Sequence, residues 1–361
     1  MAPVVRALAA AKDLDARVCV TAQHRQMLDQ VLELFDIVPN YDLDLMREGQ
    51  DLTDVTANVL FGVRSILADF VPDLVLVHGD TSTTLATSVA AYYQRIPVGH
   101  VEAGLRTGDI RSPWPEEVNR KVAGAITELH FAPTEGSRAN LLAENVPDAT
   151  IHVTGNTVID ALFQGLEIIQ RDPALASELT ERFALDPKRR LILVTGHRRE
   201  SFGGGFERIC TALKVIAERP DVEIVYPVHL NPNVRGPVEK LLGDTPNIRL
   251  IPPQDYLSFI YLMQRSTLIL TDSGGVQEEA PSLGKPVLLM RDTTERPDAV
   301  DAGTVWLVGT NVEAILAATT QLLDNDDVYR KMSDAHNPYG DGKAADRIVD
   351  VIRIWSQTLS R

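Results

Sequence analysis

Short apolar runs alternate with longer helical patterns along the whole chain. In the first half, these runs are rich in β-branched residues or leucine, and most of them precede a segment of helix length. They lie at residues 17–20, 74–77, 98–101, 129–131 and 151–153. Strands that alternate with helices are typical of βα repetition, in which the strands form one parallel sheet. The pattern predicts a doubly wound α/β domain in this half.

A second series of apolar runs follows, again with helical patterns between its members. It comprises residues 191–194, 222–226, 248–251, 268–270 and 287–289. We therefore predict two Rossmann-like, doubly wound domains that face a cleft, with ligands at the carboxyl ends of the strands. The first domain is expected to comprise residues 1–156, completed by a C-terminal helix over residues 344–361, and the second to comprise residues 157–343.

Composition places the chain among globular proteins with two domains of ordinary size. It has 361 residues, of which 44% are hydrophobic and 24% are charged. The formal net charge of -15 argues against a nucleic-acid partner, because a phosphate backbone requires a basic surface, and it favours a cytoplasmic protein. No apolar run approaches the length of a membrane span, so no membrane insertion is expected.

Two further features have simple interpretations. Cys19 and Cys210 are far apart and lack the spacing of a metal site or a disulfide framework, so we interpret both as buried thiols. The opening segment, MAPVVRALAAAKD, has the look of a signal peptide, but Arg6 interrupts its short apolar part. It is predicted to form an amphipathic helix that begins at the third residue, with no strand before it.

A phosphate-binding turn is predicted in TDSGGVQEEAPSLGKP, residues 271–286, directly after an apolar run. Ser273, Gly274 and Gly275 would open a helix there. Backbone without side chains lets N–H groups and the positive helix end approach a phosphate. Glu279 follows one turn further along and offers two acceptor oxygens that suit a ribose diol. A Ser-capped helix without a ligand is the alternative, and it would be preferred if this motif stood alone.

Carboxylates follow two neighbouring apolar runs in the first half. Asp80 lies in HGDTSTT, Glu102 in EAGLRTGD, and Glu116 and Glu117 in PWPEEVNR at a proline-bounded helix start. Carboxylates that converge on one site could abstract and return a proton, because burial and mutual repulsion raise a pKa toward the working range. The alternative for each is a helix cap or a surface carboxylate. We prefer that alternative for Glu117 and a functional role for Asp80 and Glu102.

The second half offers positive charge after the apolar run at 191–194. The following segment, TGHRRESFGGG, places His197, Arg198 and Arg199 before a glycine-rich helix start, which suits a pyrophosphate. The glycines at 203–205 lack the Lys-Ser/Thr ending of a P-loop and the spacing of a dinucleotide fingerprint. Neither ATP nor NAD is therefore supported, and a dehydrogenase is disfavoured.

Three other polar residues are candidates. Arg296 follows the run at 287–289 and could supply counter-charge, although a surface ion pair with Glu295 or Asp298 would also explain it. His229 in VYPVHLNPN could contact a ligand or be a buried histidine, and we favour the ligand. Asn156 in VTGNTVID is interpreted as a hinge or cap residue.

Taken together, the long motifs resemble those of the non-hydrolysing UDP-N-acetylglucosamine 2-epimerases of bacteria, over essentially the whole chain. They are HGDTSTTLA, GHVEAGLRTG, SPWPEE followed by NR, VTGNTVID, TGHRRESFG, YPVHLNPNV and TDSGGVQEEAPSLGKPVL. The resemblance implies two domains of glycosyltransferase-B architecture and a homodimer. It also implies inversion at C2 of UDP-GlcNAc to give UDP-ManNAc for surface polysaccharide, without a nicotinamide cofactor or an obligatory metal.

The resemblance also assigns roles to residues. UDP would be eliminated across C1 and C2 to give 2-acetamidoglucal, and it would add again after protonation on the opposite face. Asp80, Glu102 and Glu116 match the family's acid/base carboxylates, with the division of labour between them open. The remaining matches are His197 at the diphosphate, Ser273, Gly274 and Gly275 in the phosphate turn, Glu279 at the ribose, Arg296 at UDP, and Gln254 with Phe259 on the uracil side.

The chain also departs from the family pattern. Some members bind a second, regulatory UDP-GlcNAc, for which Gln23 and Gln26 match, but an arginine of that site is replaced near Gly49, which argues against allosteric activation. Members begin with a strand and a GTRPEAIK loop, which supplies an Arg and a Lys to the nucleotide sugar, whereas this sequence begins at Met1-Ala2-Pro3. We expect a truncated chain whose longer form is the active enzyme.

Three alternatives to the epimerase stay open at this point. A UDP-sugar glycosyltransferase of the same architecture would require an acceptor. A hydrolysing epimerase would release free ManNAc. A UDP-sugar binder without turnover would bind UDP and leave the C2 proton in place.

Overall fold

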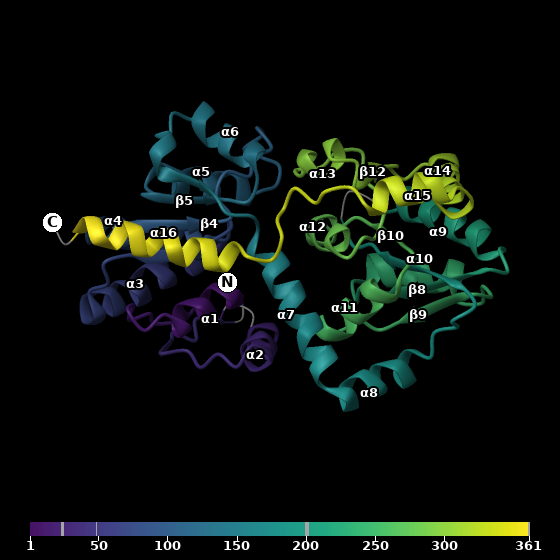
Figure 1. Ribbon diagram of the computed structural model, residues 1–361, viewed down its shortest axis with the longest axis horizontal. Helices are drawn as coiled ribbons and strands as arrows, with labels where there is room; N and C mark the ends of the chain where they lie inside the picture. The colour runs from purple at the N-terminus through teal and green to yellow at the C-terminus, as the bar shows by residue number, and fades with distance from the viewer. Residues whose placement is uncertain (23–24, 48, 199–201, 360–361) are drawn as a thin grey trace. The chain divides into compact units, whose positions relative to one another are not determined.

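The computed structural model describes residues 1–22, 25–47, 49–198 and 202–359 (Figure 1). The chain divides into two compact units: unit 1 comprises Met1–Ala161 and Gly340–Arg361, and unit 2 comprises Leu162–Tyr339. Each unit contains its own parallel sheet. The predicted α/β class, with parallel strands in both halves, is confirmed.

Unit 1 is built on a four-stranded parallel sheet of order β3-β4-β5-β6. Its strands are β3 (Val75–His78), β4 (Val98–Val101), β5 (Leu129–Ala132) and β6 (Ile151–Val153). The connecting helices are α3 (Leu52–Phe70), α4 (Ser82–Tyr93), α5 (Glu116–Ala125) and α6 (Glu135–Ala143), with a 3₁₀ turn at Asp148–Thr150. The predicted runs at 98–101 and 151–153 coincide with β4 and β6.

The strand predicted at 17–20 does not join this sheet. It is shortened to β1 (Cys19–Val20), which pairs in parallel with β2 (Tyr41–Asp42) in a separate two-stranded sheet. Helices α1 (Ala2–Ala10) and α2 (Arg25–Leu34) flank β1 along the sequence. The prediction of two buried thiols is wrong for Cys19, which is exposed, because alternate residues of a strand face opposite ways and Val20 takes the buried side. Cys210 is buried as predicted.

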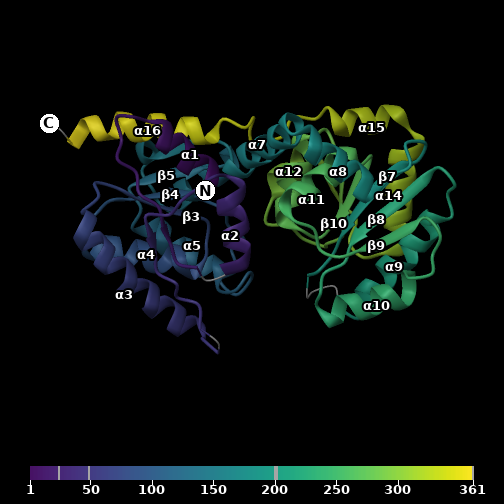
Figure 2. The same ribbon diagram turned by 90° about the horizontal axis from the view of Figure 1, so that it is seen from below.

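The C-terminal helix α16 (Ala344–Leu359) belongs to unit 1. It packs beside α1, and both views show the two helices next to each other (Figures 1 and 2). Val4, Val101 and Phe131 share a core cluster with Ile348 and Ile352 of α16. The core of this unit is therefore formed from both ends of the chain.

Helix α7 (Thr157–Arg171) crosses the limit between the units. The Asp160 carboxylate in its first turn accepts the main-chain N–H groups of Ala344 (3.2 Å) and Ala345 (2.8 Å) at the start of α16. These bonds tie the first turn of α7 to unit 1. The unit limits at 161/162 and 339/340 accordingly lie close to, but not at, the predicted divisions at 156/157 and 343/344.

Unit 2 contains a six-stranded parallel sheet of order β12-β11-β10-β7-β8-β9. The strands are β7 (Arg190–Thr195), β8 (Val222–Pro227), β9 (Ile248–Ile251), β10 (Leu268–Thr271), β11 (Val287–Leu289) and β12 (Val305–Leu307). Numbered within the unit, the order is 6-5-4-1-2-3, which is that of a doubly wound nucleotide-binding sheet. Its order reverses between β7 and β10, the place where such sheets bind ligands.

Helices cover both faces of the unit 2 sheet. Buried side chains of α9 (Gly204–Ala217), α10 (Pro232–Leu242) and α14 (Val312–Asp324) share one core cluster. Figure 2 shows α11 (Tyr256–Arg265) and α12 (Gly274–Ser282) on the opposite face. The other helices are α8 (Pro173–Phe183), α13 (Pro297–Asp301) and α15 (Asp326–Ser333). Among the described residues, no helix is long and apolar enough to cross a bilayer.

One strand of unit 2 was not predicted. β12 is only three residues long and lies at the edge of the sheet, where it pairs with β11 alone. Its last residue, Leu307, is 41% exposed. In so short a strand, covered on one side only, the alternation of apolar and polar residues is too brief to be detected in the sequence.

Candidate active site

Two turns at the carboxyl ends of β3 and β4 bring Asp80 and Glu102 together. Gly79 has a φ of +65°, and a Cβ added to it would lie 3.0 Å from Oε2 of Glu102. Glycine is therefore needed where the turn after β3 passes the Glu102 carboxylate. Burial lowers the pKa of His100 to about 4, so its neutral ring donates from Nε2 to the Gly79 carbonyl oxygen (2.7 Å). This bond holds the turn in place.

Glu102 has an unusual backbone conformation. Its φ of +65° lies in the left-handed region, which costs a non-glycine residue on the order of 1–3 kcal/mol and is concentrated at functional sites. Asn156 donates from Nδ2 to Glu102 Oε1 (3.0 Å) and accepts the main-chain N–H of Val158 (3.3 Å). Asn156 thus caps α7, as predicted, and also orients the Glu102 carboxylate.

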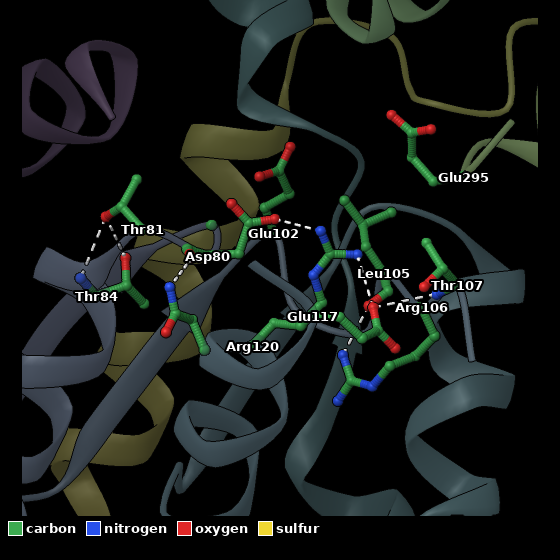
Figure 3. A network of polar contacts seen from close by, with 12 residues as sticks. Asp80, Thr81, Thr84, Glu102, Leu105, Arg106, Thr107, Glu117, Arg120 and Glu295 are labelled. Atoms are coloured by element: carbon green, nitrogen blue, oxygen red, sulfur yellow. Dashed lines mark hydrogen bonds and ion pairs between the residues drawn. The ribbon is translucent and has the colours of Figure 1, made fainter. Parts of the chain in front are cut away.

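Helix α5 supports Asp80 from the other side. Arg120 donates from a terminal nitrogen to Asp80 Oδ2 (2.5 Å), and Asn119 donates to the Asp80 carbonyl oxygen (2.8 Å). A second terminal nitrogen of Arg120 lies 3.3 Å from Glu117 Oε2. Figure 3 shows the Arg120 guanidinium between the two carboxylates. The side chain of Arg120 is only 5% exposed, so little solvent screens these contacts.

The interpretation of Glu117 as a surface or capping carboxylate is wrong. Its side chain is 0% exposed. Besides pairing with Arg120, it accepts the main-chain N–H groups of Thr107 and Gly108, each at 3.2 Å. A buried carboxylate is stable only when it is paired and hydrogen-bonded, as here. Glu117 therefore fixes the loop after β4 to α5.

Glu116 is the first residue of α5 and lies one turn before Arg120. Residues four apart on a helix share a face, so Glu116 lies on the face of α5 that carries the partner of Asp80. Its Oε2 atom is buried and has no hydrogen-bond partner within the described part of the chain. Asp80, Glu102 and Glu116 thus all belong to unit 1.

In unit 2, His197 lies two residues after the end of β7, beside the place where the strand order reverses. Asp272, at the end of β10, accepts the main-chain N–H groups of His197 (2.7 Å) and Arg198 (2.8 Å). The His197 ring stacks on that of His229, with 5.6 Å between centroids. Burial lowers the pKa of His197, although the Asp272 charge acts in the opposite direction. Arg199 lies outside the described residues.

The predicted phosphate turn opens helix α12. Ser273 is its N-cap residue in an extended conformation, and its side chain makes no capping hydrogen bond. The simple Ser-capped helix is therefore not what is observed. A Cβ on Gly274 would lie 2.6 Å from a terminal nitrogen of Arg296, so the guanidinium packs against the start of the helix. N–H groups and a cation at one helix start suit a phosphate.

Arg296 is not the surface ion pair considered as its alternative. Its side chain is 13% exposed, and it donates to Glu278 (2.5 Å) and Glu295 (2.6 Å). Burial acts to raise the pKa of Glu295, but the guanidinium groups of Arg296 and Arg291 outweigh it and hold that pKa at about 2. The carboxylates of Glu278 and Glu295 thus hold Arg296 against the start of α12.

Glu279 lies on α12 and is 7% exposed. It accepts a hydrogen bond from the Tyr256 hydroxyl of α11 (3.0 Å). Burial raises its pKa to about 8, with a further contribution from Glu278, while the Tyr256 bond opposes the shift. The predicted uracil-side residues belong to the same region: Phe259 lies on α11, and Gln254 precedes it and accepts from Arg182 (2.9 Å).

The predicted regulatory residues are described only in part. Gln23 lies outside the described residues, and Gln26 belongs to α2. The regulatory role stays a prediction.

Known proteins match this chain over nearly its full length. A model of the family described as UDP-N-acetylglucosamine 2-epimerase matches residues 6–353. The UDP-N-acetylglucosamine 2-epimerases of Yersinia pestis and Escherichia coli (strain K12) are each 62% identical to it, covering 99% and 98% of this chain and 96% and 94% of the relatives. A crystal structure of UDP-GlcNAc 2-epimerase from Neisseria meningitidis bound to UDP-GlcNAc is 50% identical, with a TM-score of 0.92, covering 98% of this chain and 95% of that one.

This chain belongs to the UDP-N-acetylglucosamine 2-epimerase family. The resemblance read from the motifs is confirmed, and so is the glycosyltransferase-B-like class of two α/β units.

Four residues that shape this epimerase-family site were not predicted for it: Arg120, Asn156, Tyr256 and Asp272. Asp272 directly precedes Ser273 at a strand end, so the rule that found Ser273 could also have found it. Arg120 lies one helical turn after Glu116, which is a signal only when the helix is known. Tyr256 and Asn156 act across long sequence separations, for which the sequence holds no local signal.

We predict that Arg120→Met lowers the free energy of unfolding by about 3–5 kcal/mol, because it leaves the carboxylates of Asp80 and Glu117 without their buried cation. Urea unfolding followed by far-ultraviolet circular dichroism measures this loss. Arg138→Met is the matched control in the same unit, since it removes an exposed pair with Asp148 and should cost less than about 1 kcal/mol. Equal losses in the two variants would contradict the prediction.

Proposed function

We propose that this chain interconverts UDP-N-acetylglucosamine and UDP-N-acetylmannosamine by inversion at C2. The observation that carries the proposal is the close approach of the turns after β3 and β4: a Cβ on Gly79, the neighbour of Asp80, would lie 3.0 Å from Glu102 Oε2. Family membership supports the same substrate, because the Neisseria meningitidis relative is bound to UDP-GlcNAc.

Unit 2 supplies the groups for the nucleotide. The N–H groups of Gly274 and Gly275 and the Arg296 guanidinium suit the diphosphate, and Glu279 suits the ribose hydroxyls. His197 follows β7 and is proposed to donate a hydrogen bond to the diphosphate. Ser273, Gln254 and Phe259 complete the proposed contacts, the last two on the uracil side.

The carboxyl groups of unit 1 are proposed to transfer the protons. A carboxylate takes the proton from C2, and the electron pair of that C–H bond forms the C1–C2 double bond as the C1–O bond to UDP breaks. The products are 2-acetamidoglucal and UDP. A second carboxyl group then returns a proton to the opposite face of C2, and UDP adds to C1, so atoms and charge balance. Asp80, Glu102 and Glu116 are proposed to share these transfers.

The contacts around the carboxylates suit this work. Asp80 accepts a hydrogen bond from the Arg120 guanidinium, and Glu102 accepts one from the Asn156 amide. These hydrogen bonds hold both carboxylates in fixed orientations, which proton transfer at C2 requires. The net charge of -15 further supports a cytoplasmic location.

We expect Asp80→Asn and Glu102→Gln to abolish epimerisation and to keep UDP affinity close to that of the wild type, because each change removes a base outside the nucleotide site. Proton NMR of UDP-GlcNAc in D2O follows deuterium at C2 and the UDP-ManNAc signals. Asp148→Asn is the control, since it alters an exposed pair with Arg138 in the same unit.

Each other outcome of this experiment identifies an alternative. Unchanged turnover in a variant would remove that residue from the mechanism. Free ManNAc would indicate a hydrolysing epimerase, and turnover only with a sugar acceptor would indicate a glycosyltransferase. UDP binding by the wild type without any C2 exchange would indicate a binding protein.

UDP binding is predicted to release a proton through Glu279. Its pKa of about 8 means that it is largely protonated at pH 7, whereas ribose hydroxyls that donate to it favour the ionised form. Binding therefore lowers this pKa and releases the proton. Calorimetry in buffers of different ionisation enthalpy measures the release, which should be smaller in Glu279→Gln. Affinity should fall roughly 10- to 100-fold, and equal proton release in both proteins would refute the linkage.

A homodimer is also proposed, through a patch that consists of Phe61, Tyr92 and Tyr93. Their exposed fractions are 59%, 58% and 76%. Gln94 donates to the Arg64 carbonyl oxygen (3.1 Å), which places the end of α4 beside the turn of α3 that carries Phe61. Exposed aromatic side chains that gather on one face are typical of protein interfaces. A second copy of the chain is the proposed occupant.

Sedimentation velocity tests this interface. The wild type is expected to sediment as a dimer and Tyr93→Asp as a monomer, because the substitution would place a charge where the dimer buries the Tyr93 ring. Ile354→Asp is the control, since Ile354 is 67% exposed on α16 of the same unit. A monomeric wild type, or a dimeric Tyr93→Asp variant, would rule out the patch as the dimer interface.

A further inference from the structure

Asp272 occupies a position in unit 2 that the proposed chemistry does not yet use. It follows β10, at the point where the strand order reverses and β7 lies alongside. It is 1% exposed. A carboxylate buried so deeply must be held by fixed donors or paired with a cation, because desolvation of an unpaired charge is costly.

The two carboxylate oxygens of Asp272 differ in their hydrogen bonds. Oδ2 accepts the main-chain N–H groups of His197 and Arg198. Oδ1 lies 3.4 Å from Nδ1 of His197 and has no hydrogen-bond partner within the described residues. This separation is slightly longer than an ordinary N–H···O hydrogen bond, and it makes the His197 ring the side-chain neighbour of the unsatisfied oxygen.

The surrounding groups fix this carboxylate rather than compete for it. A Cβ on Gly196 would lie 3.0 Å from the Tyr226 hydroxyl, so glycine permits the close approach of these two segments; Asp272 Oδ2 would lie 3.7 Å from the same Cβ. The Tyr226 hydroxyl donates to the Gly196 carbonyl oxygen (3.3 Å), not to Asp272. The hydrogen bonds that Asp272 accepts therefore come from the segment that carries His197.

His229 completes the arrangement. Its Nδ1 accepts the main-chain N–H of Asn231 (3.1 Å), so this nitrogen does not donate to His197. It stacks on His197 and supplies no negative charge. Burial lowers the pKa of His197; among the described residues, the charge of Asp272 raises this pKa, and Arg198 and His229 lower it further.

We propose that Asp272 is a positioning residue for His197, holding Nδ1–H toward its own carboxylate so that Nε2 is presented to the substrate's diphosphate. This inference rests on the proposed role of His197. The carboxylate also stabilises the imidazolium form, which can donate from Nε2 to the leaving phosphate oxygen as negative charge develops there. Asp272 itself touches no reacting atom.

The test is Asp272→Asn, which keeps an oxygen for the two main-chain N–H groups. Its amide nitrogen can only donate, so Nδ1 of His197 must become an acceptor and the proton must move to Nε2. In ¹⁵N-histidine-labelled protein, the ring nitrogen shifts of His197 should report this tautomer change. Removal of the carboxylate charge should also lower the pKa of His197. His197→Gln identifies the resonances.

Kinetics supply the second readout. Asp272→Asn should lower kcat about 10- to 100-fold, the range expected for a charge-assisted hydrogen bond, and should move the alkaline limb of the pH profile to lower pH. In a His197→Gln background the same change should have no further effect on kcat, because Asp272 acts through His197.

Two results would overturn the proposal. The first is an unchanged tautomer and pKa of His197 in Asp272→Asn. The second is an equal loss of kcat in the presence and absence of His197, as a purely structural role requires. If the wild type does not epimerise UDP-GlcNAc, the proposed function fails, whereas the NMR comparison still decides whether Asp272 controls His197.

Discussion

The register of the parallel ladders decides which side chains of this protein can meet. In unit 1, His78 of β3 pairs with Val101 of β4, so the turns that follow must lie against each other. In unit 2, Thr271 of β10 pairs with Thr195 of β7, which sets the residues after them side by side. Parallel strands end at one edge of a sheet, and both sets of polar residues follow from that constraint.

The charged side chains at these sheet edges are paired with buried groups of opposite charge, and the net charge of the chain does not reflect this arrangement. The protein carries a net charge of -15, yet Arg120 and Arg296 are each held among carboxylates and largely shielded from solvent. Fixed groups of this kind change little when charge develops on a bound molecule, which is what preorganised electrostatic stabilisation requires. The ion pairs therefore contribute mainly by fixing the positions of these side chains, and less by stabilising the fold.

Backbone strain is found at the same edges. Glu102 adopts a left-handed conformation, and Gly79 and Gly196 stand where a Cβ would meet another group closely. Such positions persist only when surrounding contacts determine them, here Asn156 for Glu102 and Asp272 for the segment after Gly196. Strain, burial and polar partners thus occur together at the edge of the unit 1 sheet, and close packing, burial and polar partners at that of unit 2.

The sequence by itself determined the α/β class, most strands and the residues that follow them, because periodicity and strand ends are local signals. It also determined the family through long motifs. Only the tertiary structure decided that Glu117 is buried, that Cys19 is exposed, and that β1 pairs outside the main sheet. It alone paired Asp80 with Arg120 and Asp272 with the His197 segment, because burial and contacts between distant residues depend on packing that no local pattern records.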